Sequence, residues 1–380
     1  MRYYIIAGEM SGDVHAAFLI KELKRADSSA EFRFWGGDNM IAQTDEKALV
    51  KHIKDLAFMG FVEVAANIGT VLKNISLCKK DMLAWSPDAV ILIDYPGFNL
   101  RMAKFAHRNG LKVFYYISPQ VWAWKSGRIK SMKKNIDKLF VILPFEKEFY
   151  KRHDMDVEFF GHPLIDEIDE YESQSNLANS LTRNLSAEER PLIALLPGSR
   201  KQEVKKIIPL YAEIADKFKQ LDFAVAAVNT LDEELYRPME GKKNVKVIFN
   251  RTYQIFDKAW AALVASGTAT LETALFDIPQ IVCYKTNPLS YWIAKKLAHV
   301  KWISLVNIIL NKYAIEELLQ ENFNREKIEE GLRKIVYNED YRKYVRMVYS
   351  ELRDKLGNKG ASEKIAKRIV AYLNDKQTDI

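Results

Sequence analysis

Acidic side chains and glycines gather near the start of the chain, in the segment GEMSGD that spans residues 8–13. The segment follows the apolar run 3–7, which predicts a turn between a first strand and a first helix. Glycines permit such a tight turn, and the turn aims backbone N–H groups toward a ligand. The spacing is not GxGxxG, so a nicotinamide cofactor is disfavoured, and a plain tight turn is the alternative. The predicted polar contacts to a substrate are Glu9, Ser11, Gly12 and Asp13.

Asp94 stands where the apolar run 89–93 ends, at the start of the segment DYPGFN. A carboxylate at the carboxyl end of an apolar strand lies at the mouth of a ligand cleft. Partial burial there raises the pKa of the group toward a value useful for a general base. The alternative is an aspartate that caps the following turn.

Two tryptophans, Trp122 and Trp124, occupy a loop after the predicted strand 113–117. Because tryptophan is costly to leave in water, the pair is predicted to line a pocket or pack under it, where sugar rings or acyl chains would bind. A basic run follows, which suits a phosphate or anionic headgroups, with a solvated face as the alternative. The basic residues are Lys125, Arg128, Lys130, Lys133 and Lys134, of which Lys125 and Arg128 are predicted substrate contacts.

Two strand-end turns in the second half suit a diphosphate. The segment LPGSR ends in Ser199 and Arg200, where free N–H groups and a guanidinium can meet phosphate oxygens. The segment ASGTATLE, residues 265–272, combines small residues with the start of a helix, whose positive end favours an anion. Glu272, the last residue of this segment, is predicted to bond ribose hydroxyls. The alternative is a surface acid that complements the helix dipole. The predicted contacts here are Ser266, Gly267, Thr268 and Glu272.

Short apolar runs alternate with amphipathic segments, which predicts a parallel α/β protein. We expect strands at 3–7, 32–35, 89–93, 113–117, 139–143, 192–196, 223–228, 245–249, 262–265 and 280–284. Helices are expected at 14–25, 61–80, 100–108 and 128–135, and from residue 324 onward. The pattern breaks at 166–190, an acidic stretch rich in Asn and Ser that suits a linker or surface segment.

This alternation predicts two doubly wound Rossmann-like domains that face one another, with ligands beyond the carboxyl ends of their strands. The expected division is an N-terminal acceptor-binding and membrane-facing domain at 1–165 and a C-terminal nucleotide-sugar domain at 190–345. Helices are expected at 346–380, and their packing back on the first domain is left open.

The composition indicates a globular protein with anionic partners. The 380 residues include 48% hydrophobic ones and carry a formal net charge of +7. The two cysteines, Cys78 and Cys283, are far apart and do not predict a zinc site, so no metal is expected. No run reaches the ~18 apolar residues of a spanning helix, and the first run reads as a strand instead of a signal peptide. A nucleic-acid-binding protein is disfavoured because no reading motif accompanies the charge.

One apolar stripe at helical spacing suggests an element that faces the membrane. It comprises Phe61, Val64, Ala65, Ile68, Val71, Leu72 and Ile75, with Phe58, Met59 and Val62 beside it and Lys73, Lys79 and Lys80 at its end. Insertion into the bilayer interface and packing against a sheet are both open. A second candidate is the segment 291–296, with Lys301 and Trp302 just beyond it.

The motifs taken together resemble those of the lipid-A-disaccharide synthase family. Over roughly residues 3–320 the order is GEMSGD, MGFVEV, IDYPGFN, YISPQVWAW, FGHP, LPGSR, ASGTATLE, VCYK and SLVNIIL. The resemblance implies a GT-B fold that needs no metal or cofactor. It also implies transfer of 2,3-diacylglucosamine from its UDP conjugate to 2,3-diacylglucosamine 1-phosphate (lipid X), giving a β(1→6) disaccharide. Another GT-B enzyme that handles a UDP-sugar is the alternative.

The same resemblance implies residue roles. Asp94 matches the proposed base, Arg200 the diphosphate contact and Glu9 the acid of the first loop. Further implied substrate contacts are Tyr284, Asn307 and Gln320. Departures are Val306 and Ile315, where the family usually has proline, and Gly97, at a position that is often Asp. The implied setting is cytoplasmic, on the inner face of the inner membrane and against its anionic surface; no nucleic-acid partner is expected and a homodimer is left open.

Overall fold

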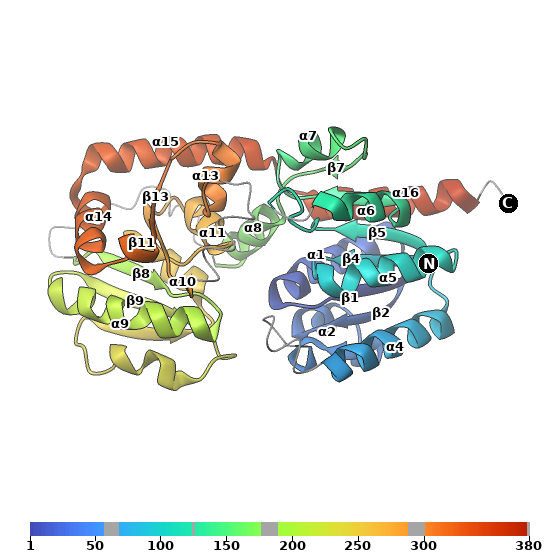
Figure 1. Cartoon of the computed structure of the whole chain (residues 1–380), viewed down its shortest axis with the longest axis horizontal. Coiled ribbons are helices and arrows are strands. Elements are labelled where there is room, and N and C mark those ends of the chain that lie inside the picture. Colours follow the sequence, from blue (N-terminus) through green and yellow to red (C-terminus); the bar gives the residue numbers. More distant parts are fainter. Residues whose placement is uncertain (57–67, 124–125, 176–188, 288–300, 378–380) are drawn as a thin grey trace. The chain divides into compact units, whose positions relative to one another are not determined.

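The computed structural model describes residues 1–56, 68–123, 126–175, 189–287 and 301–377. The chain forms two compact units, the first from Met1–Glu170 together with Leu356–Ile380 and the second from Tyr171–Lys355 (Figure 1). Compared with the expected boundaries at 165 and 346, the first unit continues to Glu170, and the chain returns to it only at Leu356.

The first unit is built on a parallel sheet in the order β3-β2-β1-β4-β5-β6-β7. Its strands are β1 (Arg2–Ala7), β2 (Glu31–Gly36), β3 (Leu49–His52), β4 (Ala89–Ile93), β5 (Lys112–Tyr116), β6 (Lys138–Val141) and β7 (Glu158–Phe159). Strands β3 and β7 were not predicted, because β3 is half-exposed and β7 has only two residues, so neither leaves an apolar run in the sequence.

Helices cover both faces of this sheet. They are α1 (Met10–Ala26), α2 (Asp38–Gln43), α4 (Ile68–Trp85), α5 (Pro96–Arg108), α6 (Ile129–Asn135), α7 (Glu146–Lys151), α8 (Pro163–Ser175) and α16 (Ala361–Gln377), with short 3-10 turns η1 (Glu46–Ala48), η2 (Ile53–Asp55) and η3 (Ser126–Arg128). Successive strand residues point to opposite faces. Tyr3 and Ile5 therefore pack with α1, α2 and α16, while Tyr4 and Ile6 pack with α4, α5, α6 and α7.

The first part of the acidic segment 166–190, residues 166–175, is helical. Residues 163–175 form α8, so this part of the predicted linker or surface segment is helical, and the chain passes from the first unit to the second within it. Its first turn has a structural task, because the Asp166 carboxylate accepts hydrogen bonds from the N–H groups of Gly360 (2.6 Å) and Ser362 (3.1 Å) at the start of α16. The polar residues that resembled a linker thus hold the returning end of the chain.

The chain returns to the first unit through a close backbone contact. The His162 N–H donates to the Leu356 carbonyl at 2.9 Å. At Gly161, where φ is +118°, a Cβ atom would lie 2.8 Å from the Asn358 carbonyl oxygen. Only glycine fits this combination of backbone angle and space. The FGHP motif therefore marks the place where two distant segments meet.

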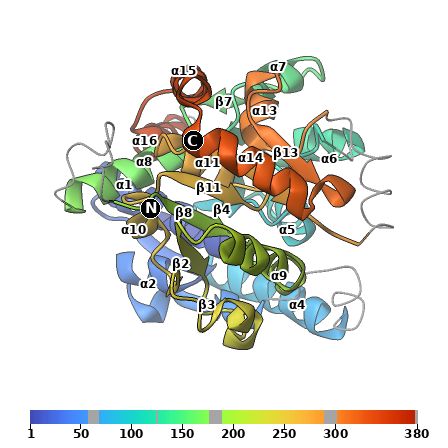
Figure 2. The same cartoon turned by 90° about the vertical axis from the view of Figure 1, so that its left-hand side faces the viewer.

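The second unit repeats the architecture with a parallel sheet in the order β10-β9-β8-β11-β12-β13. Its strands are β8 (Leu192–Leu196), β9 (Asp222–Ala227), β10 (Val245–Phe249), β11 (Ala261–Val264), β12 (Gln280–Tyr284) and β13 (Glu316–Leu319). Its helices are α9 (Lys201–Lys217), α10 (Thr252–Phe256), α11 (Ala269–Leu275), α13 (Leu305–Leu310), α14 (Arg325–Tyr337) and α15 (Glu339–Leu356), with η5 (Glu233–Met239) and η6 (Gln320–Asn322). Helices α9 and α14 lie next to each other on one face (Figure 2). The predicted α/β class with two doubly wound sheets is confirmed, and β13 is a further strand that was not predicted.

The backbone contact at Gly161 yields a stability prediction. Gly161→Ala adds a methyl group against the Asn358 carbonyl at a backbone angle that L-residues avoid, and we expect it to cost about 1–3 kcal/mol of unfolding free energy. Gly110→Ala is the matched control, because Gly110 also has positive φ (+76°) but nothing within 4 Å of its would-be Cβ. Urea denaturation at constant m-value measures both. Equal losses in the two variants would show that the contact with residue 358 adds nothing.

Candidate functional site

In the first unit the predicted site residues lie at the carboxyl ends of β1 and β4. Glu9 lies two residues beyond β1, is the N-cap of α1 and is partly exposed, and Ser11 is exposed on the first turn of that helix. Gly8 permits this arrangement because a Cβ there would lie 2.3 Å from the Tyr95 ring. The turn after β1 therefore lies against the turn that carries Asp94.

Asp94 begins a strained turn at the end of β4. Its φ is +43° and that of Tyr95 is +47°, both in the left-handed region. Two side chains hold the Asp94 carbonyl: Asn99 Nδ2 donates to it at 2.9 Å and the Tyr115 hydroxyl at 2.5 Å. Asn99 Nδ2 also lies 3.1 Å from the Ile93 carbonyl. Strain of this kind persists where the surrounding structure enforces it, which is common at functional sites.

The environment of Asp94 favours its protonated form. Burial raises the pKa of this carboxyl to about 7, the negative charge of Glu9 adds to the increase, and His15 and the Tyr95 N–H oppose it. His15 is itself buried in α1, with Nδ1 2.5 Å from a Glu167 carboxylate oxygen. A base whose pKa lies near neutrality has its unprotonated form available at neutral pH and still binds a proton well. General base catalysis requires both properties.

The aromatic loop lies after β5 and contacts α7. Ile117 has φ +64°, so it is a further residue in the left-handed region at this edge of the sheet, after Asp94 and Tyr95. The Trp122 ring packs edge-on against Phe145 at a centroid distance of 4.9 Å, and its buried N–H finds no hydrogen-bond partner among the described residues. Burial raises the pKa of Tyr115, and the positive charge of Arg128 opposes that shift, which places Arg128 near this edge. Lys125 and Trp124 lie outside the described residues.

Asp13 and Gly12 are both buried at the start of α1, and Asp13 has a structural role there. Asp13 is fully buried, and its carboxylate accepts hydrogen bonds from the N–H groups of Gly37 (2.6 Å), Asn39 (3.1 Å) and Met40 (3.3 Å) and from the Asn39 amide (2.8 Å). Both oxygens are thus used to hold the start of α2. Gly12 is buried against Ala7, and the substrate contacts of both residues stay predictions.

The second unit places Arg200 and Ser199 at the carboxyl end of β8. Arg200 is the N-cap of α9, its side chain is 63% exposed, and its Nη1 lies 3.5 Å from a Glu203 oxygen. Gly198 has φ +97°, and the Glu203 carboxylate lies 2.5 Å from where its Cβ would be. Burial raises the pKa of Glu203, while Arg200 opposes that shift. Ser199 is exposed beside this pair.

The turn after β11 brings Ser266, Gly267 and Thr268 to the same edge. Gly267 has φ +122° and no atom within 4 Å of a would-be Cβ, so glycine is needed here for its backbone angle, and the turn is open. The Thr270 hydroxyl donates to the Gly267 carbonyl at 2.8 Å, which fixes the turn. Glu272 lies in the first turn of α11. The arrangement leaves room for an anion close to the backbone.

Tyr284 and Gln320 extend this edge at the ends of β12 and β13. Burial raises the pKa of Tyr284, Glu203 adds to the increase and Arg200 opposes it, which shows that these side chains are neighbours. Gln320 follows Leu319, the residue that pairs with Tyr284 in the sheet. It has φ +52° and is buried, and its Nε2 has no partner among the described residues. Such an amide is suited to a ligand contact.

Asn307 does not join this group. Its Nδ2 donates to the Ile315 carbonyl and to Glu317, both at 2.9 Å, and its Oδ1 accepts from the N–H groups of Ala314 (2.9 Å) and Ile315 (3.0 Å). The amide therefore holds the segment 314–317, and the substrate contact of Asn307 stays a prediction. The departure at Val306 also has a consequence, because its N–H donates to the Ser304 hydroxyl at 3.2 Å, a bond that proline could not make.

Sequence analysis missed Glu146, a buried acid that follows β6. Its carboxylate accepts hydrogen bonds from the N–H groups of Leu143 (2.9 Å) and Ile142 (3.2 Å). The signal that could have found it is the one that found Asp94, namely an acid just beyond an apolar strand. Here the intervening Pro144 and Phe145 concealed it.

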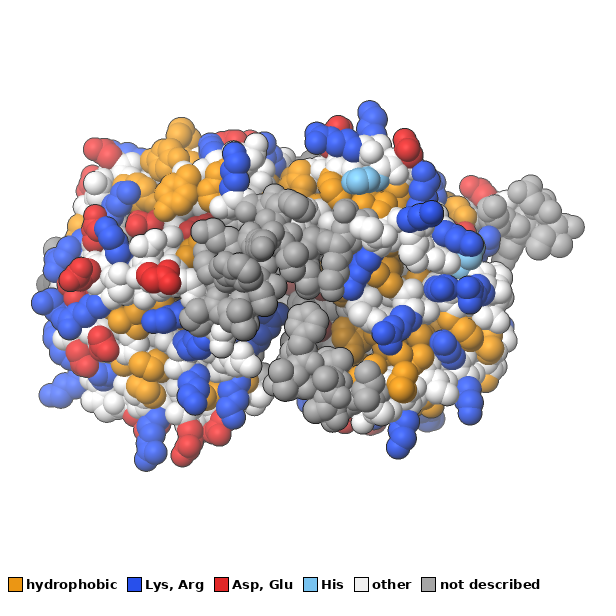
Figure 3. Space-filling view, in the orientation of Figure 1, with side chains coloured by type: hydrophobic (Ala, Val, Ile, Leu, Met, Phe, Trp, Pro, Cys, Tyr) orange, Lys and Arg blue, Asp and Glu red, His pale blue; other side chains and the backbone are white. Residues whose placement is uncertain are grey.

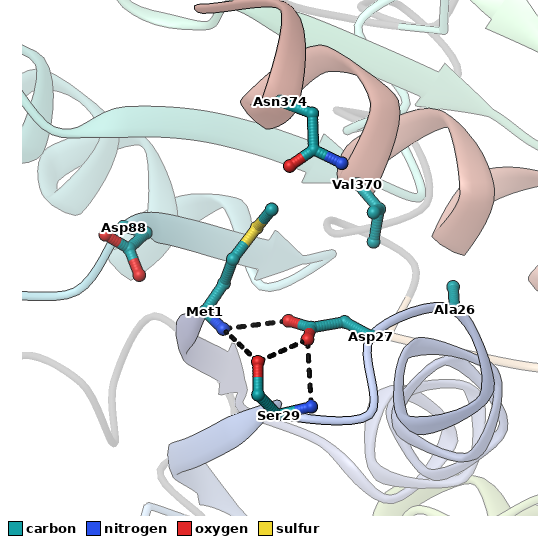
Figure 4. A pocket seen from close by; sticks show the side chains of 7 residues that line it. All are labelled: Met1, Ala26, Asp27, Ser29, Asp88, Val370 and Asn374. Carbon is teal, nitrogen blue, oxygen red and sulfur yellow. Dashed lines mark hydrogen bonds and ion pairs between the residues drawn. The ribbon is translucent and has the colours of Figure 1, made fainter. Parts of the chain in front are cut away.

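A hollow of about 480 Å³ lies away from these residues, at the amino ends of β1 and β4 (Figure 4). It is lined by Met1, Ala26, Asp27, Ser29, Asp88, Val370 and Asn374. The N-terminal ammonium group lies 2.9 Å from Asp27 and 3.4 Å from the Ser29 hydroxyl. Because ligands of doubly wound sheets bind at the carboxyl ends of the strands, this hollow is not the candidate site.

Comparisons with known proteins indicate the family of this chain. The family model described as lipid-A-disaccharide synthetase matches residues 3–371. A lipid-A-disaccharide synthase from Syntrophus aciditrophicus is 41% identical over 99% of this chain and 98% of its own length. One from Geobacter metallireducens is 34% identical over the same shares.

Solved structures share the fold at low sequence identity. A UDP-GlcNAc 2-epimerase from Neisseria meningitidis, bound to UDP-GlcNAc, has a TM-score of 0.63 and 14% identity over 99% of this chain and 100% of that chain. The glycosyltransferase of kitacinnamycin has a TM-score of 0.65 and 11% identity over 98% and 99%. These likenesses show a GT-B type of fold. With the family match over nearly the whole chain, they lead to one conclusion: the chain belongs to the lipid-A-disaccharide synthetase family, glycosyltransferases of lipid A biosynthesis.

Proposed function

We propose that this enzyme transfers 2,3-diacylglucosamine from its UDP conjugate to the 6-hydroxyl of 2,3-diacylglucosamine 1-phosphate, with inversion, and releases UDP. Membership of the family supports the choice of substrates. The observation that carries the chemistry is Asp94, a carboxyl with a pKa of about 7 held by a clamped turn at a strand end.

The first unit supplies the base. The acceptor hydroxyl must lose its proton as its oxygen attacks the anomeric carbon from the side opposite UDP, through an oxocarbenium-like transition state. Asp94 takes that proton, because its turn is fixed by Asn99 and Tyr115 while no hydrogen bond to its carboxylate involves a side chain of the described residues. Trp122 offers an apolar ring for a sugar or acyl chain, with Phe145 behind it.

The second unit supplies the contacts to the leaving group. Negative charge grows on the β-phosphate as UDP departs, and a preorganised guanidinium is suited to neutralise it. Arg200 takes this role, since it is largely exposed and its bond to Glu203 is long at 3.5 Å. The open turn at Gly267 offers N–H groups to the diphosphate, Glu272 bonds the ribose, and Gln320 provides an amide for the nucleotide.

We further propose that the enzyme binds the membrane surface through α4. Both proposed substrates carry acyl chains, and withdrawing them into water would cost ~0.8 kcal/mol per CH₂. Of the predicted stripe, Ile75 is buried and Val71 packs against the core, whereas Leu72 is 57% exposed. The residues at 58–65 lie outside the described ones, as does the segment 291–296.

The outer side of α4 supports this role. Leu72, Leu77 and Leu83 are exposed on this helix, and Lys73, Lys79 and Lys80 lie between the first and the last of them in the sequence. Figure 3 shows basic side chains interspersed with hydrophobic ones on the visible face of the first unit, at the right. In the second candidate of the sequence analysis, the Lys301 ammonium lies 5.9 Å from the centroid of the Trp302 ring. Within the described part of the chain, no helix is both long and apolar enough to span a bilayer.

The proposed reaction is tested by UDP release from the diacylated donor. We expect release to require 2,3-diacylglucosamine 1-phosphate and to be accompanied by the disaccharide, detected by mass spectrometry. UDP release that is independent of any acceptor, or that yields an epimerised sugar, would contradict the proposal.

The role of Asp94 predicts the effect of its removal. Asp94→Asn keeps the shape of the side chain but cannot accept the proton, so we expect kcat to fall ~100- to 10,000-fold while UDP still binds. In the wild type, kcat/KM should rise with pH through about 7, as the Asp94 carboxyl ionises. Asp156→Asn, at an exposed aspartate of the same unit, is the control. Near-normal turnover in Asp94→Asn would remove Asp94 from the mechanism.

The role of Arg200 predicts a loss in turnover that does not depend on metal. Arg200→Gln should reduce kcat ~100- to 1,000-fold, as expected when one preorganised donor is lost. Arg237→Gln, at an exposed arginine of the same unit whose Glu234 contact is 3.9 Å, should change little. Activity should persist in EDTA. Loss of activity in EDTA and its recovery with Mg²⁺ would show that a cation performs the task assigned to Arg200.

The role of α4 predicts weaker liposome binding after loss of its leucines. Replacing Leu72, Leu77 and Leu83 together by Ser should weaken binding to anionic liposomes at least about tenfold, since a buried leucine contributes roughly 1.5–3 kcal/mol. The fold should persist, because these side chains are exposed. Met347→Ser, at an exposed residue of α15, is the control. A folded triple variant that binds liposomes like the wild type would exclude α4 as the anchor.

A further inference from the structure

Glu203 lies in the first turn of α9, and the mechanism above gives it no role. Its side chain is only 15% exposed, whereas the side chain of the neighbouring Arg200 is 63% exposed. The Glu203 N–H donates to the Arg200 carbonyl at 3.0 Å, so the helix begins at this pair. A carboxylate in the first turn complements the helix dipole, but an exposed acid would do so as well. The burial of Glu203 therefore needs a further reason.

The turn before the helix leaves space for this carboxylate. Gly198 has φ +97°, and a Cβ atom there would lie 2.5 Å from Glu203 Oε2 and 3.3 Å from Glu203 Cβ. Only glycine therefore lets the Glu203 side chain pack against the backbone of the LPGSR turn. The same would-be Cβ lies 3.5 Å from the Ala265 Cβ, at the start of the segment ASGTATLE. Glu203 is thus fixed where the two turns proposed to bind the diphosphate adjoin.

The other oxygen of this carboxylate faces Arg200. Arg200 Nη1 lies 3.5 Å from Glu203 Oε1, and no other ion pair of Arg200 occurs among the described residues. Burial raises the pKa of Glu203, while the charge of Arg200 and hydrogen bonds from its side chain and backbone oppose that shift. The exposed guanidinium therefore has one partner, and that partner is itself held in place by the turn.

We propose that Glu203 is a positioning residue for Arg200, which holds the guanidinium at the carboxyl end of β8 until the leaving group needs its charge. The inference rests on the proposed role of Arg200 at the diphosphate. An exposed arginine loses rotamer freedom when a ligand orders it, and a fixed partner removes part of that freedom in advance. The contact is long and engages one nitrogen, so the other N–H donors remain for phosphate oxygens.

The charge of Glu203 has the opposite effect on nucleotide binding. It lies beside the turns proposed to receive the diphosphate, so it disfavours a bound anion there. Removing the charge while keeping the shape of the side chain should therefore have two separate effects. The guanidinium becomes less ordered, and the repulsion of UDP disappears. A residue that only supported the fold would not give this combination.

The first test compares Glu203→Gln with the wild type in turnover and in UDP binding. Glutamine keeps the shape and can still accept the Arg200 N–H bond, but it forms no ion pair with the guanidinium. We expect kcat to fall ~5- to 20-fold, which is less than the loss expected when the donor itself is removed. UDP affinity, measured by calorimetry, should stay within about threefold of the wild type or increase, because a nearby negative charge is gone. Glu213→Gln, at an exposed acid of the same helix, should change neither quantity.

A double-mutant cycle tests whether Glu203 acts through Arg200. In the Arg200→Gln background, Glu203→Gln should change kcat less than about twofold, because no guanidinium is left to hold. The same loss in both backgrounds would overturn the inference. So would an unchanged kcat, or a weakened affinity for UDP, in Glu203→Gln alone.

A third measurement needs no turnover. In protein with ¹⁵N-labelled arginine and no nucleotide, the NMR order parameter of Arg200 Nε, assigned with Arg200→Gln, should be lower in Glu203→Gln than in the wild type. Within the wild type it should exceed that of Arg237, an exposed arginine whose contact to Glu234 is 3.9 Å. Equal order parameters in either comparison would overturn the inference. Absence of disaccharide synthesis by the wild type would instead overturn the proposed function, while the order parameters would still decide whether Glu203 positions Arg200.

Discussion

Every strand pair in both sheets is parallel, and this constraint decides where chemistry can occur. Parallel strands end at a common edge, so polar residues that follow different strands are brought together without being close in sequence. In the first unit this edge joins Glu9, Asp94 and Glu146, and in the second it joins Arg200, Gly267 and Gln320. The helices on the two faces of each sheet serve mainly to bury the strands, which frees the strand ends to carry the polar groups.

Sequence reasoning succeeded where one local pattern determines the structure. The apolar runs 89–93, 192–196, 245–249 and 280–284 are strands with the predicted bounds, since a buried parallel strand needs a continuous apolar run. The position of Asp94 followed from the same logic. The return of the chain at Leu356 did not, because Gly161 is one glycine among many until its contact with residue 358 is seen. Strand β3 is polar enough to resemble a loop.

Two of the predicted site residues show a different limit. Asp13 and Asn307 both lie in motifs that resemble the family, yet their side chains bond to the protein itself: Asp13 to N–H groups at the start of α2, and Asn307 to the segment 314–317. A sequence pattern shows which residue type occupies a position. It does not show whether that side chain hydrogen-bonds a ligand or the protein itself. That distinction depends on how many hydrogen bonds remain unfilled, which only the fold determines.

Four acids at one sheet edge illustrate how partners, and not residue type, assign roles. Asp13 accepts bonds from Gly37, Asn39 and Met40 and therefore holds a helix. Glu9 is partly exposed and acts on Asp94 through its charge. Asp94 has its carbonyl held by the Asn99 amide, while burial destabilises its carboxylate and raises its pKa to about 7. Glu146 is buried further, and the charge of Asp94 opposes its ionisation. Differences in burial and hydrogen bonding at one sheet edge thus give different properties to carboxyl groups that would behave alike in water.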